Sequence, residues 1–314
     1  MGVKENILAQ LRVKGSMTQL DLSEAIYGDR KHGPNVYPAL MSLVSSGAVL
    51  RKGANPARYS LSGNAEPPTA AVTAPKREGA VRAAGKLTGE AAAKLIWDYH
   101  SETVRDGHGR YLSWQHCYQA FSEYRHCTDE KTVDYLALHL AFYLASWGMY
   151  RGSSFLLQKD YKVHIPVVKI LQEEQYIPLV GISAENLCEE RNLDLLDALG
   201  QRIRDCYAKE KPSFEGSPNN ATDTLITKIL LGTLGCVPAY DRYYVQSVKK
   251  NNVSSGLYNR NSVRDVARFY CAHKTAFEAL RQRLSSCGVE YPPMKLMDMC
   301  FWQDAYVDDM IGRE

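Results

Sequence analysis

The sequence lacks long hydrophobic runs and paired cysteines. Its longest apolar stretch, residues 136–149, is interrupted by His139 and falls short of the roughly 20 residues that a membrane-spanning helix needs. The 8 cysteines are scattered, without a Cys-x-x-Cys pair, and the N-terminus has no charged segment followed by an apolar one. We therefore expect a reduced, soluble, cytoplasmic protein without a disulfide framework and without a membrane partner.

The sequence also lacks the common signatures of nucleotide, hydrolase and metal chemistry. It contains no Walker loop, no Gly-x-Gly-x-x-Gly after a strand, no Gly-x-Ser-x-Gly elbow and no His-Glu-x-x-His pair. The histidines His100, His108, His116 and His126 follow one another at spacings of 8, 8 and 10 residues, which match no familiar ligand pattern. We expect neither a metal site nor a cofactor. Catalysis by a Cys–His pair stays open, because such partners meet only in the fold.

The composition is that of an ordinary globular protein with an uneven distribution of charge. Of 314 residues, 45% are hydrophobic and 23% are charged, and this length suffices for two domains or for one large domain with an appendage. Residues 1–86 hold 12 Lys and Arg against 6 Asp and Glu, whereas the remaining residues hold 26 against 29. The positive charge therefore lies at the N-terminal end, where it could meet a polyanion.

Residues 1–62 carry the pattern of three short helices and two strands. Apolar residues recur at helical spacing in three segments, and Thr18 is placed to cap the second. Two extended segments, residues 48–51 and 57–61, then flank the turn Gly53-Ala54-Asn55-Pro56. The whole segment resembles the winged helix-turn-helix family, with LVSSGAVLRKGANPARYSLS as its most typical part.

That resemblance implies binding to double-stranded DNA through the third helix and the wing. Four residues would face the major groove and three would lie near phosphates: Lys31, His32, Asn35 and Tyr37 in the first set, and Arg51, Lys52 and Arg58 in the second. Winged helices also mediate contacts between proteins, so this alternative stays open.

The rest of the chain predicts a linker and a helical domain. Residues 63–88 contain Ala, Pro, Gly and charged residues but no aromatic residue, which predicts a flexible linker. Residues 89–314 show helical periods and few alternating segments, and predict an all-α domain. Helices are expected over 90–101, 113–125, 131–147, 162–175, 183–208, 222–232, 241–250, 262–285 and 293–310. The predicted fold class is mainly α, with a small β-wing in the N-terminal domain.

The segment LLGTLGCVPAYDRYYVQSVKK, residues 230–250, holds the leading catalytic candidate. An apolar helical run stops at Gly235, turns at Pro238 and restarts at Asp241. A carboxylate at a helix start is stabilised by the free N–H groups of the first turn and by the helix dipole. A purely structural role is therefore the simplest interpretation of this Asp.

Residues 222–250 also resemble the helix-hairpin-helix DNA glycosylase superfamily, in which an apolar helix, a Pro-containing turn and an Asp follow in this order. The resemblance implies that the Asp241 carboxylate stabilises positive charge on the sugar as the base leaves. It also implies that the base is flipped out of the helix into an aromatic-lined pocket.

Two features depart from that superfamily. Residues 216–220, where Asn219 and Asn220 would contact DNA, lack the usual hairpin glycines. The lysine of bifunctional members is also missing, since Asp223 stands near its place and Lys228 comes later. The resemblance therefore implies a monofunctional enzyme that uses water as its nucleophile and leaves an abasic site.

The segment SWGMYRGSS, residues 146–154, is the candidate base pocket, together with Tyr240. Trp147 and Tyr150 could stack a base, and Arg151 could bind a phosphate or a base edge. The alternative is a helix end with a core Trp and a surface Arg.

Two further segments are less specific. In residues 106–111, a Gly-His-Gly loop and Arg110 could contact a DNA backbone or widen a pocket. Residues 294–309 contain Trp302, Tyr306 and several acids, and predict a packing helix with a solvated acidic face.

We therefore expect a DNA-acting protein, most concretely a glycosylase-like hydrolase that excises a modified or damaged base, for example a modified base of phage DNA. The alternative is a non-enzymatic winged-helix regulator whose helical domain senses a ligand or mediates oligomerisation. The mildly acidic helical domain counts against the enzyme, because glycosylases face DNA with positive charge.

Overall fold

The protein is mainly helical, with one small antiparallel sheet, as the sequence predicts. The computed structural model describes residues 3–28, 36, 39–40, 42–44, 48–52, 58–61, 87–152, 154–210, 221–286, 288 and 290–311. The chain divides into two units, Met1–Gly79 and Ala80–Glu314. None of the described helices is long and apolar enough to cross a membrane.

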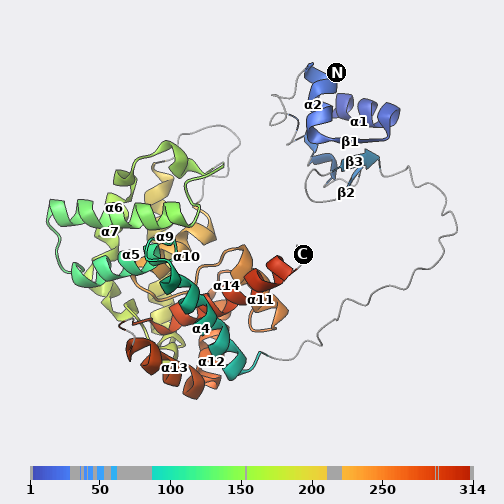
Figure 1. Ribbon diagram of the computed structural model, residues 1–314. Coiled ribbons are helices and arrows are strands. Elements are labelled where there is room, and N and C mark those ends of the chain that lie inside the picture. Colours follow the sequence, from blue (N-terminus) through green and yellow to red (C-terminus); the bar gives the residue numbers. More distant parts are fainter. Residues whose placement is uncertain are drawn as a thin grey trace. The chain divides into compact units, whose positions relative to one another are not determined.

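The N-terminal unit combines helices with a three-stranded sheet (Figure 1). Its labelled elements are α1 (Val3–Lys14), β1 (Ser16–Thr18), α2 (Gln19–Tyr27), β2 (Val49–Lys52) and β3 (Arg58–Leu61). β3 pairs antiparallel with both β1 and β2, so the strand order is β1-β3-β2.

Local sequence explains where α2 begins and ends. The Thr18 side chain accepts a hydrogen bond from the Asp21 N–H, and the Asp21 carboxylate accepts one from the Thr18 N–H. This reciprocal capping box satisfies N–H groups that a helix start would otherwise leave unpaired. Gly28 ends the helix in the left-handed conformation that favours glycine.

The second unit contains helices and no strand in the residues that the structure describes. Its helices are α4 (Gly89–Arg105), α5 (Leu112–Glu123), α6 (Glu130–Ser146), α7 (Ile165–Leu171), α8 (Ala184–Leu187), α9 (Glu190–Ala208), α10 (Asp223–Thr233), α11 (Arg242–Lys250), α12 (Arg260–Ala272), α13 (Lys274–Ser286) and α14 (Pro293–Ile311), with 3-10 helices at Phe155–Gln158, Tyr161–His164 and Glu174–Leu179. In Figure 1, α6 lies at one end of this unit, α12 and α13 lie at the other, and α14 packs between α4 and α11.

Several helix starts share one capping geometry. A Thr, Ser, Asp or Asn side chain accepts a hydrogen bond from the backbone N–H three residues later, which stabilises the first turn. These caps are Thr88, Asp129, Ser183, Thr222, Asp241 and Asn259.

Three of the expected helices are interrupted. The segment 262–285 forms α12 and α13, which break at His273, and the segment 183–208 forms α8 and α9. The segment 162–175 is part 3-10 helix and part α7. No Pro or Gly stands at the His273 break. Packing of α13 against α4 explains this break better than local sequence does.

The last helix differs from the expected packing helix with one solvated face. Every residue of α14 from Pro293 to Gln303 is buried, including Lys295 and Asp298. Acids become accessible only in its last turns, where Lys250 of α11 pairs with Asp304 and Asp308. The expectation of an acidic face therefore holds only for the C-terminal end of α14.

Close packing between α6 and α10 makes Gly232 sensitive to substitution. A Cβ atom on this glycine would lie 2.7 Å from Cδ1 of the buried Tyr143 and closer still to Cε1. We expect Gly232→Ala to lower the free energy of unfolding by about 1–3 kcal/mol through overpacking, measured by urea denaturation. Gly200→Ala in α9 is the matched control, because its new Cβ atom would find only ordinary contacts of 3.4 Å or more. The control should be neutral or stabilising by up to about 1 kcal/mol, and equal losses in both variants would contradict this account.

Candidate functional site

The turn between α10 and α11 begins with a glycine that cannot be replaced easily. Gly235 has a φ of 64°, and its N–H donates to the Leu230 carbonyl at 2.9 Å, which closes the end of α10. A Cβ atom here would lie 2.5 Å from Cγ of Pro292. The turn therefore needs glycine for its conformation and for its packing, and the apolar run stops where the sequence predicts.

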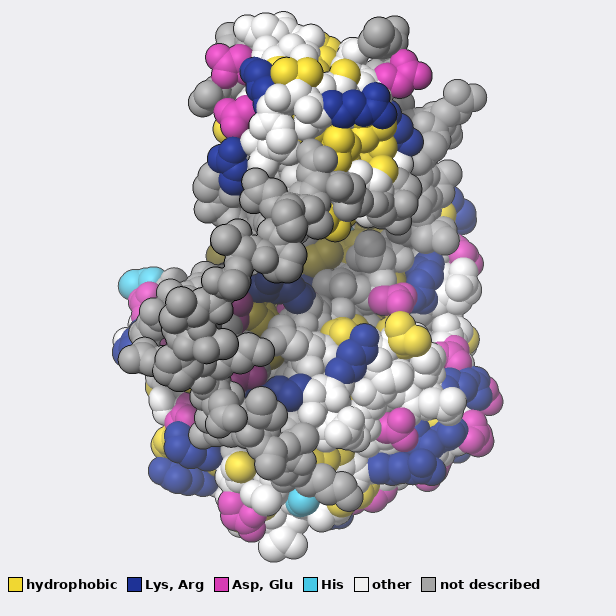
Figure 2. Space-filling view, turned by 90° about the vertical axis from the view of Figure 1, so that its right-hand side faces the viewer, with side chains coloured by type: hydrophobic (Ala, Val, Ile, Leu, Met, Phe, Trp, Pro, Cys, Tyr) yellow, Lys and Arg dark blue, Asp and Glu magenta, His cyan; other side chains and the backbone are white. Residues whose placement is uncertain are grey.

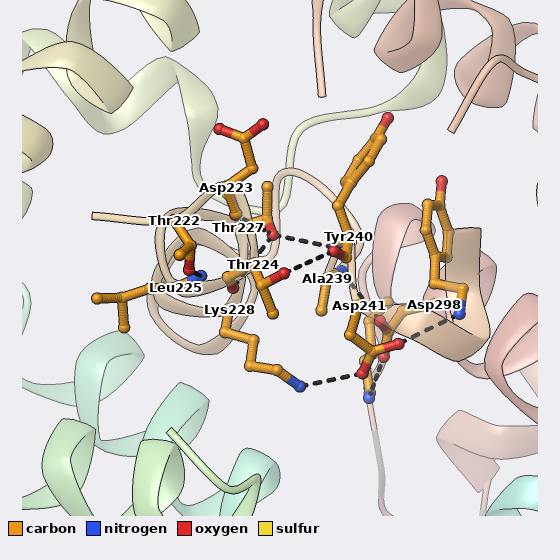
Figure 3. Close-up of polar contacts among 12 residues, drawn as sticks. Thr222, Asp223, Thr224, Leu225, Thr227, Lys228, Ala239, Tyr240, Asp241 and Asp298 are labelled. Atoms are coloured by element: carbon orange, nitrogen blue, oxygen red, sulfur yellow. Dashed lines mark hydrogen bonds and ion pairs between the residues drawn. The ribbon is translucent and has the colours of Figure 1, made fainter. Parts of the chain in front are cut away.

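Asp241 is the N-cap of α11. One carboxylate oxygen accepts the Tyr244 N–H at 3.2 Å, and the other lies 3.1 Å from Nζ of Lys228. Figure 3 shows Lys228 reaching from α10 towards Asp241. The Lys228 side chain is 5% exposed and the Asp241 side chain 17%. Both carboxylate oxygens are therefore held, and the ion pair is largely removed from water.

Side chains of α10 and α14 fix the backbone just before Asp241. The Asp298 carboxylate accepts the Ala239 N–H at 3.0 Å, and the Thr227 hydroxyl oxygen accepts the Tyr240 N–H at 2.9 Å. The Thr224 hydroxyl donates to the Tyr240 carbonyl at 2.9 Å (Figure 3). Three side chains thus replace the regular hydrogen bonds that this turn cannot make.

A second ion pair lies within α14. Nζ of Lys295 is 2.8 Å from the Asp298 carboxylate, and both side chains are less than 10% exposed. The ammonium also lies 5.0 Å from the ring centroid of Tyr99 and 4.9 Å from that of Trp114. Burial lowers the pKa of Lys295, and the adjacent Asp298 carboxylate opposes that shift.

The two ion pairs border the same cavity. Its lining comprises Tyr143, Trp147, Lys228, Leu231, Ala239, Asp241, Lys295, Asp298 and Trp302. The cavity measures about 10 Å³, which is room for about one water molecule. Two ammonium groups and two carboxylates therefore meet beside two indole rings, in a space that is too small for a nucleobase in this conformation. We call this cavity the Asp241 pocket.

Comparison with known proteins gives no guide to this arrangement. No protein-family model, curated protein or solved structure matches the chain. Among the described residues, no three His, Cys, Asp or Glu side chains come together as a metal site would need. The chemistry of the site therefore has to be argued from its own groups.

Only some of the expected pocket residues reach the Asp241 pocket. Trp147 lines it, whereas Tyr150, Arg151 and Tyr240 are not among its lining side chains. The Arg151 guanidinium lies against Gly148, where a Cβ atom would be 3.0 Å from Cζ. The Tyr240 ring points away from Asp241 (Figure 3), and its hydroxyl lies 3.0 Å from Oγ of Ser262. The structure therefore brings Asp241 and Trp147 together without the other three.

Tyr150 belongs to a separate buried network. Its hydroxyl lies 2.7 Å from Nε2 of His164, and the Tyr207 hydroxyl lies 2.6 Å from Nδ1 of the same ring. Burial lowers the pKa of His164 to about 3, so the imidazole stays neutral in the folded protein at pH 7.

This network predicts a pH-dependent stability. Unfolded His164 titrates near its usual pKa of 6.5, whereas the folded ring stays neutral down to about 3. The unfolded chain therefore binds one more proton between these values, and stability falls as the pH falls. From pH 7 to pH 5 the loss should be about 2 kcal/mol. Urea denaturation of the wild type and of His164→Gln should show a shallower pH dependence in the variant. Identical slopes would contradict the assignment.

The candidate DNA contacts of the N-terminal unit are described only in part. Arg51 on β2 is exposed. Arg58 on β3 is exposed too, but its guanidinium donates to the Ser16 carbonyl at 2.8 Å and to Oγ of Ser16 at 3.3 Å, which ties β3 to β1. Lys52 lies in β2, and its side chain is outside the described part. Outside it as well are Lys31, His32, Asn35, Tyr37, Asn219 and Asn220.

Charge on the visible face of the helical unit is mixed. Among the described side chains on this face, Figure 2 shows Lys and Arg interspersed with Asp and Glu, without one continuous basic patch. Ion pairs also join helices of this unit, for example Arg260 of α12 with Asp194 and Asp197 of α9. Contact with a polyanion on this face would therefore depend on a few local cations.

Sequence reasoning did not assign several lining residues of the Asp241 pocket to a site, among them Tyr143, Lys295, Asp298 and Trp302. The signal was present in YPPMKLMDMCFW, residues 291–302, where a Lys and an Asp three residues apart interrupt an otherwise apolar run. A helix that is apolar on all sides is buried, and charges inside such a helix need partners. Lys228 was noted in the sequence, but its contact with Asp241 depends on the turn that brings α11 back beside α10.

Proposed function

We propose that the protein is a DNA-acting hydrolase of the monofunctional glycosylase type, with the Asp241 pocket as its active site. One observation carries this proposal: Asp241, Lys228 and the Lys295–Asp298 pair border one pocket with two indole rings. Burying two ion pairs contributes little net stability compared with apolar packing, whereas strongly desolvated charges gather at functional sites.

The geometry suits a carboxylate that stabilises positive charge. The Tyr244 N–H and the Lys228 ammonium each hold one oxygen of Asp241, so its orientation is set before the substrate arrives. As the bond between the base and C1′ breaks, the sugar becomes positively charged, and a preorganised anion lowers the energy of that state. The base would leave with the bonding electron pair, and a water molecule beside Asp241 would form the new bond to C1′. The proton that this water loses would pass through the Asp241 carboxylate to the departing base, so that an abasic sugar and a protonated base result.

Substrate entry requires the pocket to open. Trp147 and Trp302 line the pocket from the end of α6 and from α14, and they would wall a flipped base. Trp147 is followed by Gly148 and then by Gly152, which both have positive φ angles. Rotation of the Trp147 side chain on this turn is the opening step in the proposal.

The N-terminal unit would hold the DNA. Its helices and three-stranded antiparallel sheet, its excess of Lys and Arg, and the exposed Arg51 and Arg58 support a winged-helix module that binds duplex DNA. The order of α10, Gly235, Pro238 and Asp241 at the start of α11 supports a likeness to helix-hairpin-helix glycosylases.

A second function is favoured by a specific observation. Each charge that borders the Asp241 pocket has a partner of opposite sign, and the closed pocket has room only for about one water molecule. This arrangement suits a non-enzymatic DNA-binding regulator, in which both ion pairs would only stabilise the helical unit and no substrate would enter the pocket.

An assay of base release separates the two functions. The full chain is incubated with duplexes and single strands that carry damaged or modified bases, and half of each sample is then heated in alkali. A monofunctional glycosylase gives strand breaks only after alkali. Breaks without alkali, together with a covalent adduct trapped by borohydride, would instead identify a lysine amine as the nucleophile. Sequence-specific binding without base release from any substrate would support the regulator and contradict the enzyme.

A further inference from the structure

Five aromatic rings form a continuous group that includes two side chains of the Asp241 pocket. They are Tyr111, Trp147, Tyr243, Trp302 and Tyr306, and we call them the aromatic rim. Trp147 and Trp302 line the pocket itself. Tyr111 contacts both edge to face, at 5.5 and 5.9 Å between ring centroids. Tyr243 and Tyr306 contact Trp302 at 5.3 and 4.7 Å.

The rim is brought together from four separate segments of the chain. Tyr111 immediately precedes α5, Trp147 ends α6, Tyr243 belongs to α11, and the other two rings belong to α14. All except Trp302 are partly exposed to solvent. An aromatic surface that reaches solvent beside a cavity with buried charges offers flat faces to a planar ligand.

Two arginines extend this surface. Cζ of Arg110 lies 5.2 Å from the ring centroid of Trp147 and 5.4 Å from that of Tyr111, and Cζ of Arg242 lies 4.5 Å from the ring of Tyr243. Asp309 is 3.6 Å from the Arg242 guanidinium, whereas no carboxylate of the described residues pairs with Arg110. A guanidinium on an aromatic face can stack on a base and donate to a phosphate at the same time.

Trp147 also carries a donor that lacks an acceptor. Its Nε1–H is buried, and no group in the described part of the chain accepts a hydrogen bond from it. Leaving such a group unpaired is costly, and an acceptor on a ligand removes the penalty. Nucleobases present carbonyl oxygens and ring nitrogens that accept hydrogen bonds.

We propose that the aromatic rim and Arg110 bind an unpaired nucleotide of single-stranded DNA, with its base against the rings and its phosphate at Arg110. The rings match the π face of a base, and the uncompensated guanidinium matches the phosphate. The rim then delivers the base to the Asp241 pocket once Trp147 has moved. This proposal rests on the proposed function for the choice of DNA and for the direction of delivery.

Binding of a short oligo(dT) to the full chain tests the proposal. Fluorescence anisotropy of the labelled oligonucleotide gives the affinity, and quenching of the intrinsic Trp emission reports contact with the rim. We expect Arg110→Ala to weaken binding about tenfold and to leave binding of a long duplex unchanged. Arg110→Lys should recover only part of the loss, because an ammonium keeps the charge but does not stack.

Arg283→Ala is the matched control. Cζ of Arg283 lies 3.5 Å from the ring centroid of Trp97, so this residue is also an arginine stacked on an indole. The Trp97 ring pairs with His100 and with none of the five rings of the aromatic rim. The control should bind oligo(dT) as the wild type does. An equal loss in both variants, or no loss in Arg110→Ala, would overturn the proposal. So would equal, Arg110-dependent binding of an abasic sugar-phosphate oligomer, because stacking would then play no part.

The same experiment separates failure of this inference from failure of the proposed function. Arg110-dependent binding of oligo(dT), with no base release from any substrate, would support the rim and contradict the glycosylase. Base release that Arg110→Ala leaves unchanged, with no measurable oligo(dT) binding, would support the glycosylase and contradict the rim.

Discussion

Asp241→Asn should lower the rate of base release by a factor of about 100–1,000 or more, the size of effect seen when one preorganised electrostatic group is removed from an active site. Asn is as good an N-cap as Asp, so α11 should keep its first turn, although the buried Lys228 ammonium loses its carboxylate partner and the fold loses stability. The negative charge that stabilises the sugar cation would be lost. The measurement is the single-turnover rate of alkali-sensitive strand breaks, with the circular dichroism spectrum as a check on folding.

A neighbouring acid provides the control for this prediction. Asp223 lies in the first turn of α10 and pairs with Arg204, and its side chain is 54% exposed. Asp223→Asn should keep the wild-type rate. Asp241→Glu keeps the charge but moves it by one methylene, so it should retain more activity than Asp241→Asn. Wild-type turnover in Asp241→Asn would exclude Asp241 as the catalytic carboxylate.

Lys295→Met should lower the free energy of unfolding by about 3–5 kcal/mol, because it leaves the Asp298 carboxylate buried without its ammonium partner. The Ala239 N–H still donates to Asp298 in this variant, but one neutral donor does not replace a full charge in a site shielded from water. Urea denaturation at pH 7 measures the loss.

Two further variants test the origin of that loss. Lys250→Met removes a lysine that pairs with Asp304 and Asp308 at a side-chain exposure of 43%, and it should cost less than about 1 kcal/mol. The double variant Lys295→Met, Asp298→Asn should recover part of the loss, because Asn keeps an acceptor for the Ala239 N–H and carries no charge. A loss in Lys295→Met no larger than that in Lys250→Met would contradict a tightly coupled pair.

The sequence was a good guide where structure depends on local chemistry. The cap at Thr18, the stop at Gly235 and the helix start at Asp241 each follow from one side chain or one backbone conformation, and such features are visible in a short window. The mainly helical fold with a small sheet follows from periodicity over longer windows. The break at His273 has no local cause and could not be predicted in this way.

Sequence reasoning placed Asp241 and Trp147 in the candidate site, and both line the pocket, but it did not identify the charged residues that complete it. Asp241 stands in a recognisable order of segments, but Lys295 and Asp298 come from a helix more than 50 residues away in sequence. Tyr150 is close to Trp147 in the chain, yet its hydroxyl turns to His164 rather than to the pocket. Packing between helices decides which side chains line the same pocket. The spacing of residues along the sequence does not predict this.

The burial of α10 limits how this protein can change over generations. Every residue from Leu225 to Thr233 is buried, including Lys228, so one helix supplies both the core and a charged group of the candidate site. A mutation in that stretch is expected to destabilise the fold, so selection removes it whatever its effect on activity. We therefore expect substitutions that change ligand preference without loss of the fold mainly at accessible positions, such as Arg110 and Tyr243. Substitutions of the charged residues in the Asp241 pocket should be rarer.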